Sequence, residues 1–159
     1  MMRVSEITRI VVLTVTVALM MFVLQPLPYI RGLISLSDVT EPESWVSEYY
    51  MKGAAIVFFA STIATVIWLV FAATSKGHKG HEVNRSLPIW WIIGLIPLIG
   101  IGFAIGPYKG SNDALLSLTF FYIIDVLILY WLTTATSTPG SLMYIPPFSY
   151  IMRDLIGDK

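Results

Sequence analysis

The chain of 159 residues is 56% hydrophobic and only 13% charged, and its formal net charge is zero. A soluble domain of this length carries roughly twice that charged fraction, and a chain without net positive charge offers no general basic surface to nucleic acid. The absence of cysteine excludes disulfides, thiolate metal sites, iron–sulfur clusters and cysteine nucleophiles.

Four stretches are long and apolar enough to cross a bilayer, whose hydrocarbon core requires about 20 residues of helix. None of them alternates apolar and polar residues as a strand of a membrane β-barrel does. We therefore predict an all-α integral membrane protein, with a four-helix transmembrane bundle over residues 1–135 and an apolar, aromatic tail over residues 136–159. The predicted spans cover about residues 10–30, 53–73, 87–105 and 114–134.

The first span follows two basic residues and could be mistaken for a signal peptide. However, Gln25, Pro26 and Pro28 follow its apolar run, and no small-residue cleavage site is present. We interpret it as a retained helix that bends or ends near Pro26. The acidic loop after it is predicted to hold a short interfacial helix from about Glu43 to Tyr50.

The loop between the second and third spans contains both histidines, His78 and His81, among glycines and lysines. A metal site needs more ligands on a rigid frame, so no metal is predicted, and contact of a basic loop with anionic headgroups is preferred.

The third span contains two overlapping pairs of small residues at the spacing that lets helix backbones approach closely. We predict a helix-packing face, within the bundle or against a partner. Its members are Gly100, Gly102, Ala104 and Gly106.

Asp125 is the most informative polar residue, because it lies near the middle of the fourth span. It is eleven residues, or about 16 Å of helix, beyond Ala114, too deep for its short side chain to reach the headgroups. A charge at this depth costs about 2.5–3.5 kcal/mol, and no predicted span contains Lys, Arg or His. Three arrangements offset the cost: a protonated carboxyl hydrogen-bonded to a neighbouring helix, a water-filled path that exchanges protons, or a basic residue, ion or cofactor from another subunit.

The tail is too short to span a membrane and too apolar to extend into water. We predict that it lies in the membrane interface or fills a groove on a neighbouring protein. The residues expected to make this contact are Tyr144, Pro146, Pro147, Phe148 and Tyr150.

The positions of the basic residues set the orientation. Seven of the ten Lys and Arg lie in the amino end, the second loop and the tail, which four spans place on one side. Positive charge is concentrated on the cytoplasmic side of membrane proteins. Both ends are therefore predicted to be cytoplasmic, in a multi-pass protein of the cell membrane. The seven are Arg3, Arg9, Lys76, Lys79, Arg85, Arg153 and Lys159; Arg31, Lys52 and Lys109 lie opposite.

No set of residues for catalysis is apparent, because the only histidines lie in a loop and are unavailable to ligate haem or to activate a serine within the spans. We predict no enzyme activity and no cofactor. The expected function is that of an accessory, non-catalytic subunit that packs against and stabilises other membrane protein subunits and contacts lipids, in a respiratory or other energy-converting, transport or secretion assembly. The alternative is a small proton-coupled transporter or channel that uses Asp125 in a homo-oligomer.

Overall fold

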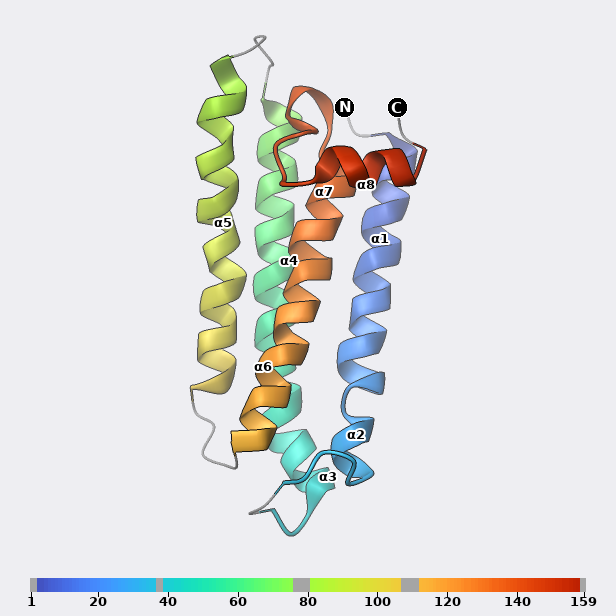
Figure 1. Ribbon diagram of the computed structural model, residues 1–159, viewed down its shortest axis with the longest axis vertical. Coiled ribbons are helices and arrows are strands. Elements are labelled where there is room, and N and C mark those ends of the chain that lie inside the picture. The colour runs from blue at the N-terminus through green and yellow to red at the C-terminus, as the bar shows by residue number, and fades with distance from the viewer. Residues whose placement is uncertain (1–2, 37–38, 76–80, 107–111, 158–159) are drawn as a thin grey trace.

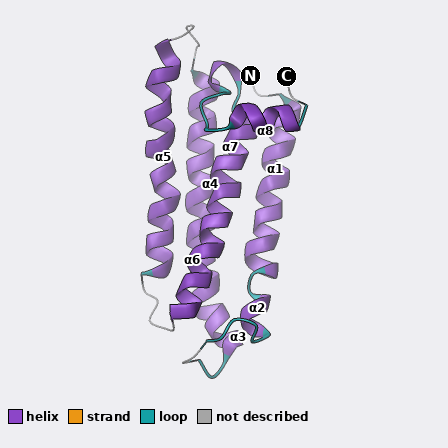
Figure 2. Ribbon diagram, viewed as in Figure 1, coloured by secondary structure: helices purple, strands orange, loops and turns teal. Residues whose placement is uncertain are grey.

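The computed structural model describes residues 3–36, 39–75, 81–106 and 112–157. Throughout these residues the regular elements are helices, without a strand (Figure 2), which confirms the predicted all-α fold for this part of the chain. The elements are α1 Val4–Leu19, the π-helical η1 Met20–Leu24, α2 Leu27–Ile30, α3 Pro42–Trp45, the π-helical η2 Val46–Tyr50, α4 Met51–Thr74, α5 His81–Ile105, α6 Asn112–Val126, the π-helical η3 Leu127–Leu132, α7 Thr133–Ser137, the 3-10 helix η4 Gly140–Leu142 and α8 Ser149–Leu155.

Within the described residues, four helical runs are long and apolar enough to cross a membrane, and each contains one predicted span. The runs extend past the predicted spans because helix formation continues into polar flanking residues that hydropathy leaves out. These dimensions suggest a multi-pass membrane protein. The runs are Val4–Ile30, Pro42–Thr74, Ser86–Ile105 and Ala114–Ser137.

The four long helices stand side by side, with the start of α1 and the short α8 at one end of the bundle and α2 and α3 at the other (Figure 1). The central helix is α4, which packs against α5, against the fourth run formed by α6, η3 and α7, and against η1. The first run lies against η3 and α7, whereas α5 packs chiefly on α4 and forms an edge of the bundle.

Small and large apolar side chains alternate along the buried face of α4, where Ala54, Val57, Ala64 and Trp68 are fully buried. The outward faces are apolar as well: Val12 and Leu19 of α1, for example, are each 55% exposed. In water such a surface would drive association, whereas hydrocarbon accepts it.

Two predicted features of the helix ends appear in modified form. The first run is interrupted at Gln25 and Pro26, as the proline predicts. The segment predicted as an interfacial helix from about Glu43 to Tyr50 is helical, but it continues without a break into α4. Lys76, His78, Lys79, Lys109 and Lys159 lie outside the described residues, so the predictions for the basic loop and for their part of the charge bias stay predictions.

Candidate functional site

The first long helix leaves one backbone carbonyl without its usual donor. In the π-helical turn η1, the amide of Gln25 donates to the carbonyl of Met20, five residues earlier, at 2.8 Å. The next amide in this register would bond to Met21, but Pro26 has no N–H to donate. A buried carbonyl without a donor is unfavourable, so another group must take that place.

Tyr50, the last residue of η2, supplies the missing donor. Its hydroxyl donates to the Met21 carbonyl at 2.8 Å and lies 2.8 Å from the side-chain oxygen of Gln25. Tyr50 is fully buried. The proline-broken end of the first run is thereby joined to the start of the second.

Asp125 completes this cluster from the fourth run. Its side chain is fully buried, and the amide nitrogen of Gln25 donates to its Oδ1 at 2.8 Å. Its second oxygen, Oδ2, has no hydrogen-bond partner among the described residues. The structure therefore contains a hydrogen bond between helices at Asp125, with Gln25 as the donor, and the choice among the three arrangements considered from the sequence stays a prediction.

Two arrangements of protons fit these atomic positions. In the first, Gln25 donates to Asp125 and the single hydroxyl proton of Tyr50 is shared by two acceptors. In the second, the Gln25 amide is turned by 180°, so that its nitrogen donates to Tyr50 and its oxygen accepts from a protonated Asp125. The second gives Tyr50 one acceptor and leaves Asp125 uncharged. Both join Asp125 to Gln25 within one chain.

Aromatic rings surround the cluster on the side of α2 and α3. Tyr29 lies 5.7 Å from the Tyr50 ring and 5.2 Å from the Trp45 ring, measured between ring centroids. The Tyr122 hydroxyl donates to the backbone carbonyl of Tyr50 at 3.3 Å. A cavity of about 310 Å³ reaches Tyr122 between Glu48 and Lys52, and Asp125 does not line it.

A second polar cluster, which we did not predict, lies at the opposite end of the fourth run. The last carbonyls of a helix have no partner within the helix and favour nearby cations. Here Arg9 of α1 donates to the carbonyl of Thr136 at 2.7 Å, and the buried Arg153 of α8 donates to the carbonyl of Thr138. Two arginines that sequence reasoning treated only as topology signals thus cap a helix end.

The same threonine-rich end forms side-chain hydrogen bonds with α4 and α5. The indole nitrogen of Trp68 in α4 donates to the Thr138 hydroxyl at 2.8 Å, and that of Trp90 in α5 donates to the Thr134 hydroxyl at 3.1 Å. The sequence contained a signal for this cluster. Five of the six residues after Leu132 are Ser or Thr, which is unusually polar for the end of an apolar span.

The tail folds back over this end of the bundle. Leu142 and Ile145 are buried in the core, and the indole nitrogen of Trp131 donates to the carbonyl of Pro147 at 2.7 Å. Among the residues predicted to contact a partner or the interface, Pro146 is buried and Pro147 is half-buried. The aromatic ones remain available for the predicted contact, which stays a prediction. They are Tyr144, Phe148 and Tyr150, at 58%, 60% and 61% exposed.

The four small residues of the third run divide into two faces. A Cβ on Gly100 would stand 2.8 Å from the Cβ of Ala60 in α4, and Ala104 lies against Gly53 of α4. By contrast, a Cβ on Gly102 would meet no described atom within 4 Å. Gly106, one residue past the end of α5, is also exposed, although a Cβ there would stand 2.9 Å from the backbone oxygen of Gly102. The structure thus places Gly100 and Ala104 in the bundle and the other pair on its surface.

No group of three or more His, Asp or Glu side chains that could hold a metal ion occurs within the described ranges. No family model, no curated protein and no solved structure matches this chain.

Proposed function

We propose that this chain is an accessory, non-catalytic subunit of a larger membrane protein complex, inserted in the cell membrane with both ends cytoplasmic. It packs against and stabilises partner subunits within a respiratory or other energy-converting, transport or secretion assembly. Lipids contact the rest of its apolar surface.

The observation that carries this proposal is the division of small residues on α5. Small residues at a spacing of four allow two helices to pack closely in a membrane, where packing and not hydrophobic burial drives association. Gly100 and Ala104 are already used against α4, whereas Gly102 and Gly106 face outward. A helix from another subunit can approach α5 along this open pair.

The position of α5 supports the same interpretation. It stands at an edge of the bundle (Figure 1), and the large side chains that flank the open pair are unburied, with Ile99 at 57% and Phe103 at 68% exposed. A partner helix would therefore contact the exposed backbone at the two glycines and the apolar side chains that flank them.

The test is purification in mild detergent followed by native mass spectrometry. We expect several different subunits to co-purify with the unaltered chain and to be lost from Gly102→Leu, which fills the open face without touching the bundle. Ala73→Leu, a similar enlargement at an exposed position of α4, should keep them. A chain that purifies without other subunits, or one whose partners are indifferent to Gly102→Leu, contradicts the proposal.

A second function, proton-coupled transport by a homo-oligomer, is favoured by a different observation. Asp125 has an oxygen without a described partner, and a cavity beside Glu48 and Lys52 ends at Tyr122, one helical turn from Asp125. Reconstituted vesicles distinguish the two functions. Proton-dependent flux that is abolished by Asp125→Asn, from a protein that purifies as a homodimer, would establish transport and overturn the accessory proposal.

A further inference from the structure

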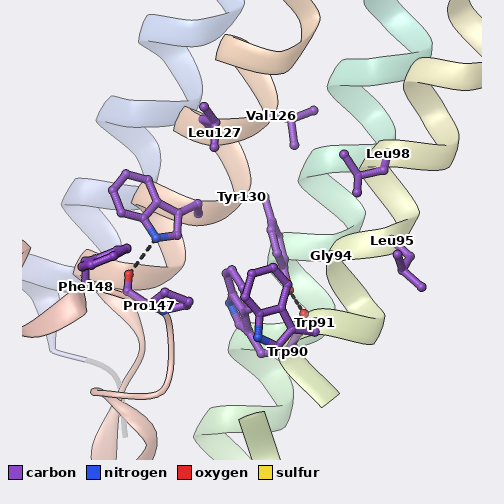
Figure 3. A pocket seen from close by; sticks show the side chains of 11 residues that line it. Trp90, Trp91, Gly94, Leu95, Leu98, Val126, Leu127, Tyr130, Pro147 and Phe148 are labelled. Atoms are coloured by element: carbon purple, nitrogen blue, oxygen red, sulfur yellow. Dashed lines mark hydrogen bonds between the residues drawn. The ribbon is translucent and has the colours of Figure 1, made fainter. Parts of the chain in front are cut away.

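An apolar groove runs between α5 and the fourth run at the end of the bundle that carries α8. Its volume is about 420 Å³, and the tail contributes Pro147 and Phe148 to its lining, beside Trp131 (Figure 3). The remaining walls are aromatic and aliphatic side chains from the two helices, among them Trp90, Trp91, Leu95, Leu98, Leu127 and Trp131.

Three of the rings in this wall have their polar atoms bonded within the chain. Trp90 donates its indole N–H to Thr134, Tyr130 its hydroxyl to the backbone carbonyl of Trp90, and Trp131 its indole N–H to Pro147. The rings of Trp90 and Tyr130 are stacked, with centroids 5.0 Å apart. These three rings leave only carbon surface for an occupant, which selects hydrocarbon.

Phe148 adds an unusual backbone conformation to the lining of the groove. Its φ of +62° puts it in the left-handed region, which a bulky residue adopts only where its surroundings hold it there. Its side chain is 60% exposed and lines the groove. The strain therefore places an aromatic ring where an occupant would meet it.

The length of the groove suits a lipid chain. Along α5 the groove extends from Trp90 to Leu98, which is about 12 Å of helix. One leaflet of the hydrocarbon core is about 15 Å deep. The groove is therefore close in length to the part of a lipid chain that lies in one leaflet.

We infer that this groove binds one acyl chain of a membrane phospholipid, held along α5 and η3 and in contact with Phe148. The inference rests on the membrane insertion proposed above, but not on the accessory role. The groove ends at Leu98, about 6 Å of helix before the open Gly102, so the lipid site adjoins the proposed partner surface without including Gly102.

The experiment uses the full chain in phosphatidylcholine vesicles that contain a phospholipid with a photoreactive diazirine in one acyl chain. After illumination, adducts are mapped by peptide mass spectrometry. We expect several-fold more adducts at groove residues such as Leu98 and Leu127 than at Ile99 and Phe120, which are exposed at 57% and 61% outside the groove. Leu98→Trp, which fills the groove, should lower the adducts at Leu127 several-fold. Ile99→Trp, one residue along the helix, should leave them unchanged.

Flotation of the same vesicles separates the possible failures. A chain that does not float with the lipid refutes membrane insertion and this inference together. A chain that floats but shows equal adducts inside and outside the groove has only ordinary contact with surrounding lipid, which overturns the inference alone. Absence of co-purified subunits bears on the accessory proposal only.

Discussion

Replacement of Gln25 tests the central hydrogen bond of the buried cluster. Gln25→Met keeps the length of the side chain but removes both polar groups, so Asp125 loses its only described partner. A buried polar group left without a partner costs about 1–3 kcal/mol. Tyr50 retains the Met21 carbonyl, so it adds little to this loss. We expect Gln25→Met to lower the free energy of unfolding by about 1–3 kcal/mol.

A double-mutant cycle isolates the pairwise contribution. Asp125→Leu preserves the branched shape of the side chain, and the double variant strands neither partner. Hydrogen bonds between membrane helices contribute about 0.6 kcal/mol on average and about 1.7 kcal/mol at most, so the double variant should be less destabilised than the sum of the single variants by about 0.6 kcal/mol.

The assay is unfolding of the purified chain in mixed micelles by titration with sodium dodecyl sulfate, followed by circular dichroism. Thr16→Val, at an exposed position of the same helix, is the control and should stay within about 0.5 kcal/mol of the unaltered chain. Strict additivity of the two replacements, or a Gln25→Met chain as stable as this control, would refute the interaction between Gln25 and Asp125.

Two further predictions concern the tail and the helix contact. Arg153→Met removes a charge-assisted bond to a helix end, worth about 1.5–3 kcal/mol, and should speed hydrogen exchange in residues 142–155, whereas the exposed Asp154→Asn should not. Gly100→Ala places a Cβ 2.8 Å from that of Ala60 and should cost about 1–3 kcal/mol in the same unfolding assay. Ala60→Gly should recover most of that loss, and Gly102→Ala should cause none; failure of the rescue would show that the two helices do not touch there.

The long helices could be predicted from sequence because their cause is local. A run of about 20 apolar residues satisfies its own backbone only as a helix, whatever surrounds it. The break near Pro26 is equally local, since a missing N–H acts within one turn. The extension from Glu43 into α4 was not predicted, because the helix continues through polar residues that an apolar window ignores.

The partner of Asp125 could not be predicted because it depends on which helices become neighbours. Gln25 and Asp125 are 100 residues apart in the chain, and neither apolar length nor charge bias specifies their contact. A signal was nevertheless available. Gln25 is the one carboxamide in the first predicted span, and it directly precedes the proline that frees a carbonyl. Two polar features that are costly in an apolar setting are candidates to satisfy each other.

The tail illustrates the same limit at the other end of the bundle. Its apolar composition indicated only that it avoids water, and composition does not tell a neighbouring protein from the chain's own helix ends. The deciding residues are Arg9 and Arg153, whose guanidinium groups donate to carbonyls at the end of α7. Their role as caps depends on where the helix stops, at Ser137, and a positive charge by itself marks only a side of the membrane.

The first helical run is held in the bundle mainly by polar contacts and only slightly by apolar burial. Only 11% of its most apolar window is buried, against 28–39% for the other three runs. Yet it is held at both ends: Arg9 bonds to the end of α7, and Gln25, Tyr29 and the Met21 carbonyl bond to the fourth and second runs. In hydrocarbon, apolar side chains gain little by leaving lipid for a neighbouring helix, whereas a polar group gains a partner it cannot find elsewhere. The residues that fix this helix in place are therefore the few that are not apolar.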